Sequence, residues 1–535
     1  MSHIGKPPCD SAAVLHAAPS APCAIAQRRW TLVAAVLGSA MAFVDGTLAN
    51  VALPALQHAF DADASQLQWV IEAYSLMLAA LLLVGGALGD RFGRRRIFVI
   101  GVVIFVVASL ACAVANSMHQ LVTARGIQGI GAALLVPGSL ALISATYPQA
   151  ERGRAIGIWS AWSGVAAALG PVLGGYLVDH YSWRWAFAVN LPVGALLLLI
   201  CRLRVPESRS GEKDPVDSVG ALLATLALAG IVFALIEAPR TDQPAVRWIV
   251  ALAAGVVGGI AFVLFERRAH APMLPLSLFK ARDFSGTNLL TLLLYGALGG
   301  GLYFVPLVLI QVQGLSATAA GAALLPFVAI MFLLSGWAGG LVDRFGPRPP
   351  LIVGPLIAAI GFAAFALPAA GANYWSGFLP AVCVLGLGMA VTVVPLTTTV
   401  MNAVGAERAG TASGVNNAVA RAAGLLAIAA FGIVMARVFE LRLAEQLQPL
   451  GLSADVVAQV TAQHDKLAAL TLPAGLPDVQ AQALRLAVGD AFISGFRRVM
   501  LLCAALCVLA ALSAWTLIAG IGARPTPHSA APRTR

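Results

Sequence analysis

Long apolar runs, separated by short polar segments, fill most of this chain. A helix needs about 20 largely apolar residues to cross a bilayer, because every backbone polar group inside hydrocarbon needs an internal partner. Fourteen runs meet that length, near residues 30–52, 67–89, 97–116, 120–143, 154–178, 184–203, 217–237, 246–266, 284–309, 318–340, 351–369, 377–400, 410–438 and 494–521. The pattern predicts an all-α integral membrane protein with fourteen transmembrane helices.

The composition agrees with this pattern and excludes several other classes of protein. Hydrophobic residues make up 59% of the 535 residues and charged residues only 11%, which is too apolar for an ordinary soluble protein. The seven cysteines form no CxxC pair and the eight histidines show no ligand spacing, so neither a disulfide framework nor a metal site is predicted. We expect no cofactor, and the scattered basic residues argue against a nucleic-acid partner.

The basic residues predict which end of each helix faces the cytoplasm. With a cytoplasmic amino terminus, 23 of the 34 Lys and Arg residues fall on the inner side and 9 on the outer side, while Arg125 and Arg421 lie inside spans. This asymmetry is the positive-inside signature. It predicts a multi-pass protein of the cell membrane with both termini in the cytoplasm, a disordered N-terminal tail over residues 1–29 and a C-terminal tail over 522–535.

The predicted outward loop over residues 440–490 is the longest connection between spans. Its acidic residues outnumber its basic ones, which fits the outer side. Periodic Val and Leu residues, among them Val456, Val460 and Leu467, allow a short amphipathic helix at the membrane surface. A solvated loop helix explains the same pattern and is the interpretation that we favour.

Two echoes in the sequence indicate an internal repeat. The stretch Gly89–Arg96 recurs 253 residues later as Val342–Pro349, and residues 136–137 are matched by 394–395 at nearly the same offset. Duplicated six-helix units of this kind occur in transporters. We therefore expect two six-helix bundles with two inserted helices between them, over residues 30–203, 284–521 and 217–266 respectively.

At these positions the chain resembles the major facilitator superfamily, and within it the fourteen-helix drug:proton antiporter family of EmrB/QacA type. The resemblance covers nearly the whole chain. Its motifs are the helix 1 signature Asp45–Pro54, the loop motif Gly89–Arg96, the helix 4 motif Arg125–Gly129 and the helix 5 antiporter motif Gly170-Pro171-x-x-Gly174-Gly175. The second loop motif departs from the pattern, because Pro347 and Pro349 replace the arginines of the first copy, which weakens its expected charge role.

The resemblance implies a proton-coupled antiporter that exports amphipathic small molecules by alternating access of its two halves. The energy source would be the proton motive force rather than a cofactor. The expected partners are the lipid bilayer, small amphipathic substrates and protons, and a periplasmic adaptor with an outer-membrane channel is a further candidate.

Three ionisable residues inside N-terminal spans form a candidate proton site. Asp45 lies about 7 residues, or roughly 10 Å, from the predicted outer end of its helix, and Glu72 and Arg125 lie about 5 residues, or roughly 8 Å, from theirs. We expect all three to meet in one layer, where the arginine holds one acid ionised and the other acid binds and releases a proton. The same resemblance assigns these residues to coupling. A structural ion pair with a spare acid is the alternative.

Two other motifs suggest conformational roles. The loop residues Asp90, Arg91, Gly93 and Arg94, with Asp343 and Arg344 in the second copy, are expected to form a latch that bonds across the cytoplasmic face in one conformation. Their alternative role is topology alone. Gly170, Pro171, Gly174 and Gly175 allow helix 5 to approach a neighbour closely and seal the pathway, although a purely structural interface fits the bare sequence equally well.

The substrate cavity is predicted from aromatic and polar residues of the C-terminal half. A sparsely polar aromatic pocket suits amphipathic drugs. The candidates are Tyr295, Tyr303, Phe304, Phe327, Asn416, Asn417 and Arg421. Arg421 is the one C-terminal charge near mid-membrane, where it can meet an anionic substrate or an acid of the N-terminal half.

Three alternatives to a multidrug exporter stay open at this point. A dedicated exporter of one metabolite or antibiotic would use the same machinery, and a symporter would share the fold. A polytopic membrane enzyme or sensor is the third alternative. It is disfavoured because the sequence has no nucleophile motif, phosphate-binding loop or large soluble domain.

Overall fold

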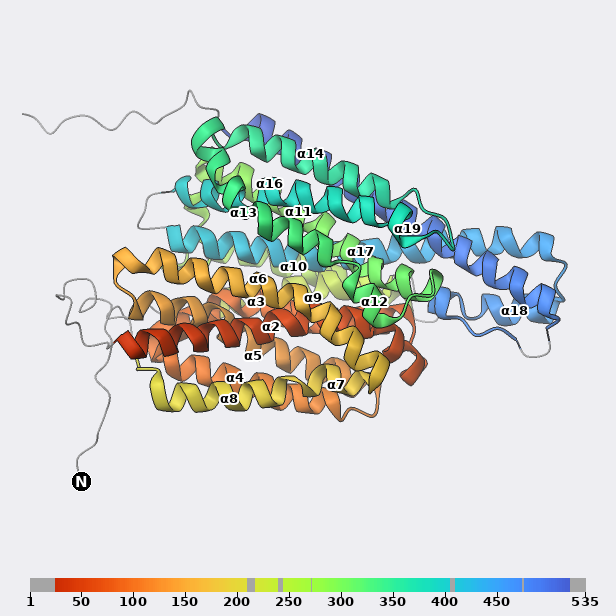
Figure 1. Cartoon of the computed structure of the whole chain (residues 1–535), viewed down its shortest axis with the longest axis horizontal. Helices are drawn as coiled ribbons and strands as arrows, with labels where there is room; N and C mark the ends of the chain where they lie inside the picture. Colours follow the sequence, from red (N-terminus) through yellow and green to blue (C-terminus); the bar gives the residue numbers. More distant parts are fainter. Residues whose placement is uncertain are drawn as a thin grey trace, which may run out of the picture.

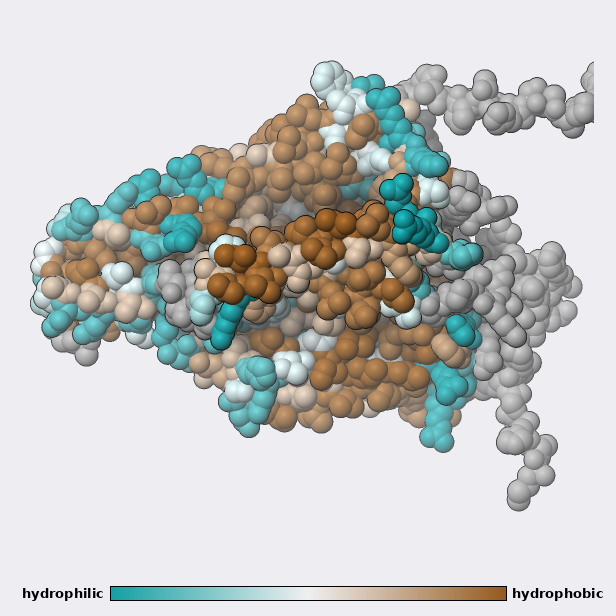
Figure 2. Space-filling view, turned by 180° about the vertical axis from the view of Figure 1, so that it is seen from behind, coloured by the Kyte–Doolittle hydropathy of each residue, from teal (hydrophilic) through white to brown (hydrophobic). Residues whose placement is uncertain are grey.

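The structure is a computed structural model that describes residues 25–208, 217–238, 244–270, 272–404, 409–473 and 476–519. Within these ranges the regular secondary structure is entirely helical. Fourteen helical segments are long and apolar enough to cross a membrane, which confirms the class predicted from hydropathy. In Figure 2 a band of hydrophobic side chains crosses the middle of the molecule and hydrophilic side chains border it at both ends.

The N-terminal half and the insertion run from α2 to α10. Their bounds are α2 (Ile25–Phe60), α3 (Ala64–Phe92), α4 (Arg94–Ala113), α5 (Met118–Thr146), α6 (Gln149–His180), α7 (Trp183–Ala188), α8 (Asn190–Arg204), α9 (Ser218–Glu237) and α10 (Ala245–Glu266). The short helix α7 and helix α8 together form a single candidate span.

The C-terminal half follows a short 3₁₀ turn, η1 (Leu276–Lys280). Its elements are α11 (Arg282–Leu307), η2 (Val308–Val312), α12 (Ala317–Ala322), α13 (Leu325–Phe345), α14 (Arg348–Phe365), α15 (Tyr374–Gly377), α16 (Leu379–Asn402), α17 (Ala409–Leu447), η4 (Gln448–Leu450), α18 (Ala454–Thr461), η5 (His464–Ala469) and α19 (Asp478–Leu517).

The two halves repeat one packing pattern. In the N-terminal half α5 packs on α3 and α4, and α2 packs on α6 and α8; in the C-terminal half α16 packs on α13 and α14, and α11 packs on α17 and α19. The repeated stretches Gly89–Arg96 and Val342–Pro349 also form the same turn between two helices. Gly93 and Gly346 follow α3 and α13 with φ of 110° and 76°, a region that favours glycine.

The ends of the molecule differ in how the halves meet. Because α2 and α3 are antiparallel, the Gly93 turn lies where α2 begins; we call this the Gly93 end, and we call the opposite end the α18 end (Figure 1). At the α18 end α6 packs on α12, so that a Cβ on Gly175 would lie 2.3 Å from the Ala317 carbonyl oxygen. Towards the Gly93 end, a Cβ on Gly164 of α6 or Gly336 of α13 would meet nothing within 4 Å. Helix α6 therefore meets the C-terminal half at the α18 end and has open space towards the other end, where α3 and α17 still meet at Leu83 and Gly414.

The inserted helices α9 and α10 form a hairpin against the bundle. Helix α9 packs on α3 and α17, and so contacts both halves. Helix α10 packs on α9 through two glycines, because a Cβ on Gly255 would lie 2.7 Å from the Ile231 nitrogen and one on Gly230 would lie 2.6 Å from the Ala251 oxygen.

Several predicted boundaries are wrong. Helix α2 begins at Ile25, inside the predicted tail, because Arg28 has partners there: its carbonyl oxygen accepts a hydrogen bond from Tyr147 Oη (3.0 Å) and its side chain pairs with Glu151 (3.5 Å). Residues 1–24 of that tail, and the predicted C-terminal tail 522–535, lie outside the described residues.

The predicted loop over residues 440–490 is largely helical. Helix α17 continues to Leu447 and α19 begins at Asp478, so these helices contain 39 and 40 residues and extend past the hydrocarbon at the α18 end (Figure 1). Between them, α18 (Ala454–Thr461) forms part of the predicted amphipathic segment. Val460 is fully buried and Leu467 nearly so, because both pack into a hydrophobic core to which both halves contribute, which a solvated loop would not do.

The close approach of α9 and α10 predicts a position-specific effect of adding one methyl group. Gly255→Ala places Cβ against the α9 backbone, which cannot move aside cheaply, and overpacking costs about 1–3 kcal/mol. Gly259→Ala is the matched control, since its Cβ would only meet Ala227 Cβ at 3.8 Å. Thermal unfolding of the purified variants in detergent should give a lower midpoint for Gly255→Ala alone. Equal midpoints would show that this contact is loose.

Candidate functional site

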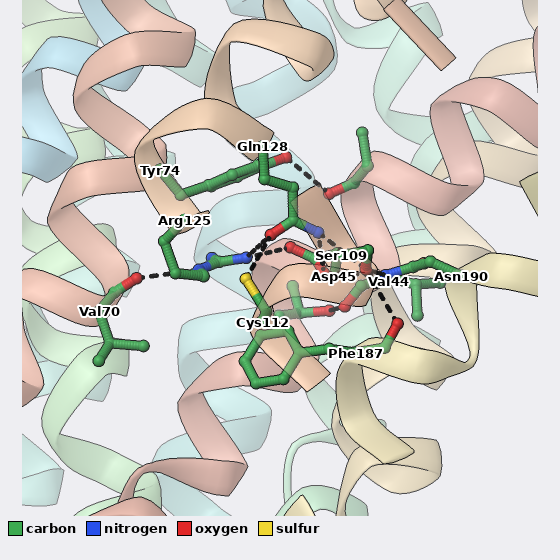
Figure 3. Close-up of polar contacts among 12 residues, drawn as sticks. Val44, Asp45, Val70, Tyr74, Ser109, Cys112, Arg125, Gln128, Phe187 and Asn190 are labelled. Carbon is green, nitrogen blue, oxygen red and sulfur yellow. Dashed lines mark hydrogen bonds and ion pairs between the residues drawn. The ribbon is translucent and has the colours of Figure 1, made fainter. Parts of the chain in front are cut away.

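A buried ion pair lies at the centre of the N-terminal half. Arg125 Nη1 of α5 is 2.5 Å from Asp45 Oδ2 of α2, and both side chains are fully buried (Figure 3). A charge pair removed from water is retained only where further hydrogen bonds satisfy its remaining atoms. The surroundings of these two side chains therefore decide whether the pair is stable.

Three polar side chains from three helices complete the pair. Gln128 of α5 accepts a hydrogen bond from Arg125 (2.7 Å) and donates one to Asp45 Oδ1 (2.8 Å). Asn190, at the start of α8, donates to Asp45 Oδ1 (3.0 Å) and to Ser109 Oγ of α4 (2.9 Å). We call Asp45, Ser109, Arg125, Gln128 and Asn190 the polar cluster (Figure 3).

The guanidinium of Arg125 has further contacts outside the polar cluster. Its Nε donates to the Val70 carbonyl oxygen of α3 (3.0 Å), and its Cζ lies 4.4 Å from the Tyr74 ring centroid and 5.7 Å from that of Phe187. One terminal nitrogen, Nη2, is buried and makes no hydrogen bond. Arg125 thus keeps one free donor inside the bundle.

The motif Arg125–Gly129 and the residues after it explain how α5 approaches α3 and α4 closely enough to form the polar cluster. Gln128 follows Arg125 by three residues and so lies on the same face of α5. A Cβ on Gly129 would lie 2.3 Å from the Tyr74 carbonyl oxygen of α3, and one on Gly131 would lie 2.6 Å from the Phe105 nitrogen of α4. These glycines let α5 contact both neighbours at backbone distance, which brings the polar cluster together.

Glu72 is the exception among the three predicted proton-site residues. It is 0% exposed, and neither of its carboxyl oxygens makes a hydrogen bond. Asp45 and Arg125 therefore meet as expected, whereas Glu72 lies apart from them in this conformation.

The predicted common depth is also wrong in detail. Helix α2 runs on to Phe60, so Asp45 lies 15 residues, or roughly 22 Å, from its end rather than about 10 Å. The helix continues past Pro54 because Leu53 and Leu56 are fully buried on the core face. Asp45 still reaches Arg125, since the helices end at different heights.

The loop motif forms its contacts within the N-terminal half. Arg94 pairs with Asp90 at 2.7 Å, and Arg91 stacks near Phe92. Glu207 accepts hydrogen bonds from the backbone nitrogens of Arg95 (3.0 Å) and Arg96, and so caps the start of α4. No described bond of Asp90 or Arg94 reaches the C-terminal half.

The second copy of the loop motif is described only in part. Arg344 is exposed and lies over the Phe345 ring at 5.2 Å, as Arg91 does over Phe92. The side chain of Asp343 lies outside the described part of the chain. The latch role of both copies stays a prediction.

The antiporter motif lies where α6 crosses two helices. A Cβ on Gly170 would clash with Thr47 of α2, one on Gly174 with Leu48, and one on Gly175 with α12. On the α12 side, a Cβ on Gly321 would lie 2.2 Å from the Pro171 carbonyl oxygen. The motif therefore supports a close contact within the N-terminal half and a second one between halves.

Asp179, one turn beyond the motif, adds a polar contact between the halves. Its carboxylate accepts hydrogen bonds from the backbone nitrogens of Ala317 (3.1 Å) and Thr318 (2.7 Å), and from the Thr318 hydroxyl (2.5 Å). Free backbone N–H groups at a helix start favour a carboxylate. Asp179 thus ties α6 to the start of α12.

The predicted cavity residues are divided between core and interface. Tyr303, Phe304 and Phe327 are buried, and the first two line a cavity of about 20 Å³, which holds a water rather than a drug. Tyr295 is half-buried and packs against the same core.

The polar cavity residues lie on α17. Asn416 accepts a hydrogen bond from Thr291 of α11 (2.7 Å), while Asn417 is exposed. Arg421 is half-buried and lies 6.0 Å from the Phe43 ring of α2, so it faces the N-terminal half. Among the described residues no ion pair of Arg421 is found. Its role in binding substrate stays a prediction.

Sequence reasoning missed four residues of these sites. Ser109 and Asn190 stand as isolated polar residues in apolar runs, and that isolation is the signal that could have found them. Asp179 and Glu207 act on helix starts that only the fold brings near. No group of three or more His, Cys, Asp or Glu residues able to hold a metal ion occurs in the described ranges.

Comparison with known proteins decides the family. The sequence pattern of the Major Facilitator Superfamily matches residues 35–428. The chain belongs to the major facilitator superfamily. This makes it a membrane transporter rather than an enzyme, and its fourteen candidate spans and resistance relatives confirm the drug:proton antiporter family within it.

Two curated relatives illustrate the likeness. The multidrug resistance protein Stp of Mycobacterium tuberculosis is 39% identical over 409 residues, covering 76% of this chain and 75% of that protein. The tetracenomycin C resistance and export protein of Streptomyces glaucescens is 36% identical over 412 residues, covering 76% of each.

Solved structures support the fold alone. A bacterial homolog to the human lysosomal transporter Spinster superimposes with a TM-score of 0.59 at 18% identity, covering 92% of this chain and 98% of that one. The xylose transporter XylE from E. coli gives a TM-score of 0.55 at 17% identity, with 92% and 96% covered.

The ion pair predicts a rescue between two substitutions. Asp45→Ala leaves the Arg125 charge buried and unpaired, which costs about 3–5 kcal/mol and should lower the thermal unfolding midpoint of the purified protein. Adding Arg125→Gln removes that charge and should recover much of the loss. The single variant Arg125→Gln gives the second reference. If the midpoint of the double variant falls by the sum of the decreases in the two single variants, the two side chains do not interact.

Proposed function

We propose that this transporter exports amphipathic drugs in exchange for protons, by alternating access of its two halves. The observation that carries the proposal is the pair of buried acids in different surroundings. Asp45 is paired with Arg125, whereas Glu72 is buried without a hydrogen-bond partner. A lone carboxylate inside the membrane is costly, so Glu72 is expected to hold its proton in this conformation.

The positions of Asp45 and Glu72 suggest how proton binding could be coupled to movement of the two halves. Glu72 is buried on α3, which packs on α17 of the other half, so a movement of the halves would change its surroundings. Arg125 has one free donor nitrogen, which a rearranged acid could meet. One acid would then release its proton as the other, freed from its ion pair, accepts one.

The contacts between the halves support alternating access. In the conformation described, α6 meets α12 at the α18 end, whereas Gly164 of α6 and Gly336 of α13 have open space towards the Gly93 end. Opening the α18 end requires the Asp179 carboxylate to leave the start of α12. By the positive-inside pattern the Gly93 end would face the cytoplasm, and the conformation would then be inward-facing.

The names of the relatives support drugs as substrates. Both a multidrug resistance protein and a protein named for one antibiotic, tetracenomycin C, are similar to this chain. A dedicated exporter of one antibiotic is therefore the second candidate. A resistance panel that includes tetracenomycin C and ethidium separates the two, since a dedicated exporter protects against a single compound class. A periplasmic adaptor and an outer-membrane channel are candidate partners.

Removing either acid should uncouple transport. In everted vesicles, Asp45→Asn and Glu72→Gln should each abolish proton-driven ethidium accumulation while the protein stays in the membrane, because neither amide can carry the proton. Asp455→Asn is the matched control, since Asp455 is exposed on α18. Full proton-driven transport by both variants would remove the acids from the mechanism.

Blocking the contact between α6 and α12 should shift the conformation. Gly175→Leu cannot close against Ala317, so spin labels at His180 and Ala319 should move apart in purified protein that lacks the native cysteines. Gly164→Leu is the control, because its side chain has open space. An unchanged distance distribution in Gly175→Leu would mean that this contact does not govern closure.

A further inference from the structure

A groove of about 520 Å³ runs between α17 and α19, outside the polar cluster and outside the small cavity of Tyr303. It lies on the last part of α17, nearest the α18 end, and on the middle of α19. Its walls are Val434, Val438, Leu441, Arg442 and Glu445 of α17, with Arg498, Leu501 and Leu502 of α19. Leu441, Leu501 and Leu502 are each at least 40% exposed, so the groove is open to the surroundings of the bundle.

Two hydrogen bonds fix the depth of this groove in the bilayer. Arg348, at the start of α14, donates to the Trp515 carbonyl oxygen of α19, and Arg497 donates to the Pro368 carbonyl oxygen just beyond the end of α14 (3.3 Å). Helix α14 contains 18 residues, so residues 497–515 of α19 span roughly 27 Å, close to the thickness of the hydrocarbon. Arg498 therefore lies at the hydrocarbon boundary on the α18 side.

The lining changes from apolar to charged in the direction of that boundary. Along α17 the valines come first and Arg442 and Glu445 last, nearest the α18 end. Along α19, which runs the opposite way, Leu501 and Leu502 lie deeper than Arg498. This order matches the order of acyl chain and headgroup in a lipid.

One of the two arginines that line the groove has no described acidic partner. Arg442 is bound to Glu445 at 2.7 Å, so these two charges neutralise each other. Arg498 is exposed and, within the described residues, makes no hydrogen bond or ion pair. An arginine at this depth binds a phosphate through two parallel hydrogen bonds.

We propose that this groove is a binding site for one anionic phospholipid. Its phosphate would bind Arg498, and an acyl chain would lie against Leu501 and Leu502, which are deeper. Its headgroup would point along α17 towards the Arg442–Glu445 pair, since Gly495 of α19 contacts Met435 and Arg498 is therefore level with the start of the α17 wall. In the orientation proposed above this lipid belongs to the extracytoplasmic leaflet. A free phosphate would satisfy Arg498 but would leave the apolar wall uncovered.

Native mass spectrometry of the delipidated protein in detergent, titrated with dioleoylphosphatidylglycerol, tests the site. The wild type should bind this lipid, and Arg498→Gln should bind it about tenfold more weakly, as expected for one charge-assisted contact. Leu502→Trp should weaken binding as well, because it fills the acyl part and keeps every charge. Arg437→Gln is the control, since Arg437 is an exposed arginine of α17 that pairs with Glu440 outside the groove.

Separate arms of the titration identify the ligand. Dioleoylphosphatidylcholine and inorganic phosphate should each bind the wild type much more weakly than phosphatidylglycerol. Equal binding of phosphatidylcholine would overturn the preference for an anionic lipid, and competition by inorganic phosphate at equal strength would indicate a free-anion site. Unchanged phosphatidylglycerol binding by both Arg498→Gln and Leu502→Trp would place the lipid elsewhere.

Discussion

The cost of placing charge inside a membrane shapes this protein. Arg125 and Asp45 lie far from water, and the structure offsets their burial with an ion pair, hydrogen bonds from Gln128 and Asn190, and the faces of two aromatic rings. Every contact requires α2, α4, α5 and α8 to lie close together, so the electrostatics fix the geometry of the N-terminal half. The same cost makes the unpartnered Glu72 stand out, because nothing in the described structure stabilises its charge.

Close packing by glycine is what makes that geometry possible. At Gly129, Gly131 and Gly175 an added Cβ would collide with the backbone of a neighbouring helix. The first two hold the polar cluster together, while Gly175 serves the contact between halves. The closely packed N-terminal bundle and the glycine-lined junction with α12 would serve the proposed alternating-access cycle as its proton site and as the interface that parts.

The sequence predicts the architecture well because hydropathy and repeats are local signals. The fourteen spans, the turn at Gly93 and the family follow from residues adjacent in the chain. The meeting of Asp45 with Arg125 could be expected from the cost of unpaired charge. The separation of Glu72 could not, because it depends on which helix each side chain faces. Asp179 and Glu207 escaped for a similar reason: they bond to helix starts over 100 residues away, and nothing near them in the sequence marks those partners. The ends of α17 and α19 nearest α18 mix polar and apolar residues. A search for continuous apolar runs therefore predicts helices that are too short.

The central claim is that drug and proton move in opposite directions through one molecule. Purified protein in liposomes that contain a pH-sensitive dye, with no ion gradient at the start, tests it most directly. An ethidium gradient across the membrane should drive a proton flux of opposite direction, and a protonophore should collapse the pH change. Ethidium movement without any proton flux, or with a proton flux in the same direction, would contradict the account.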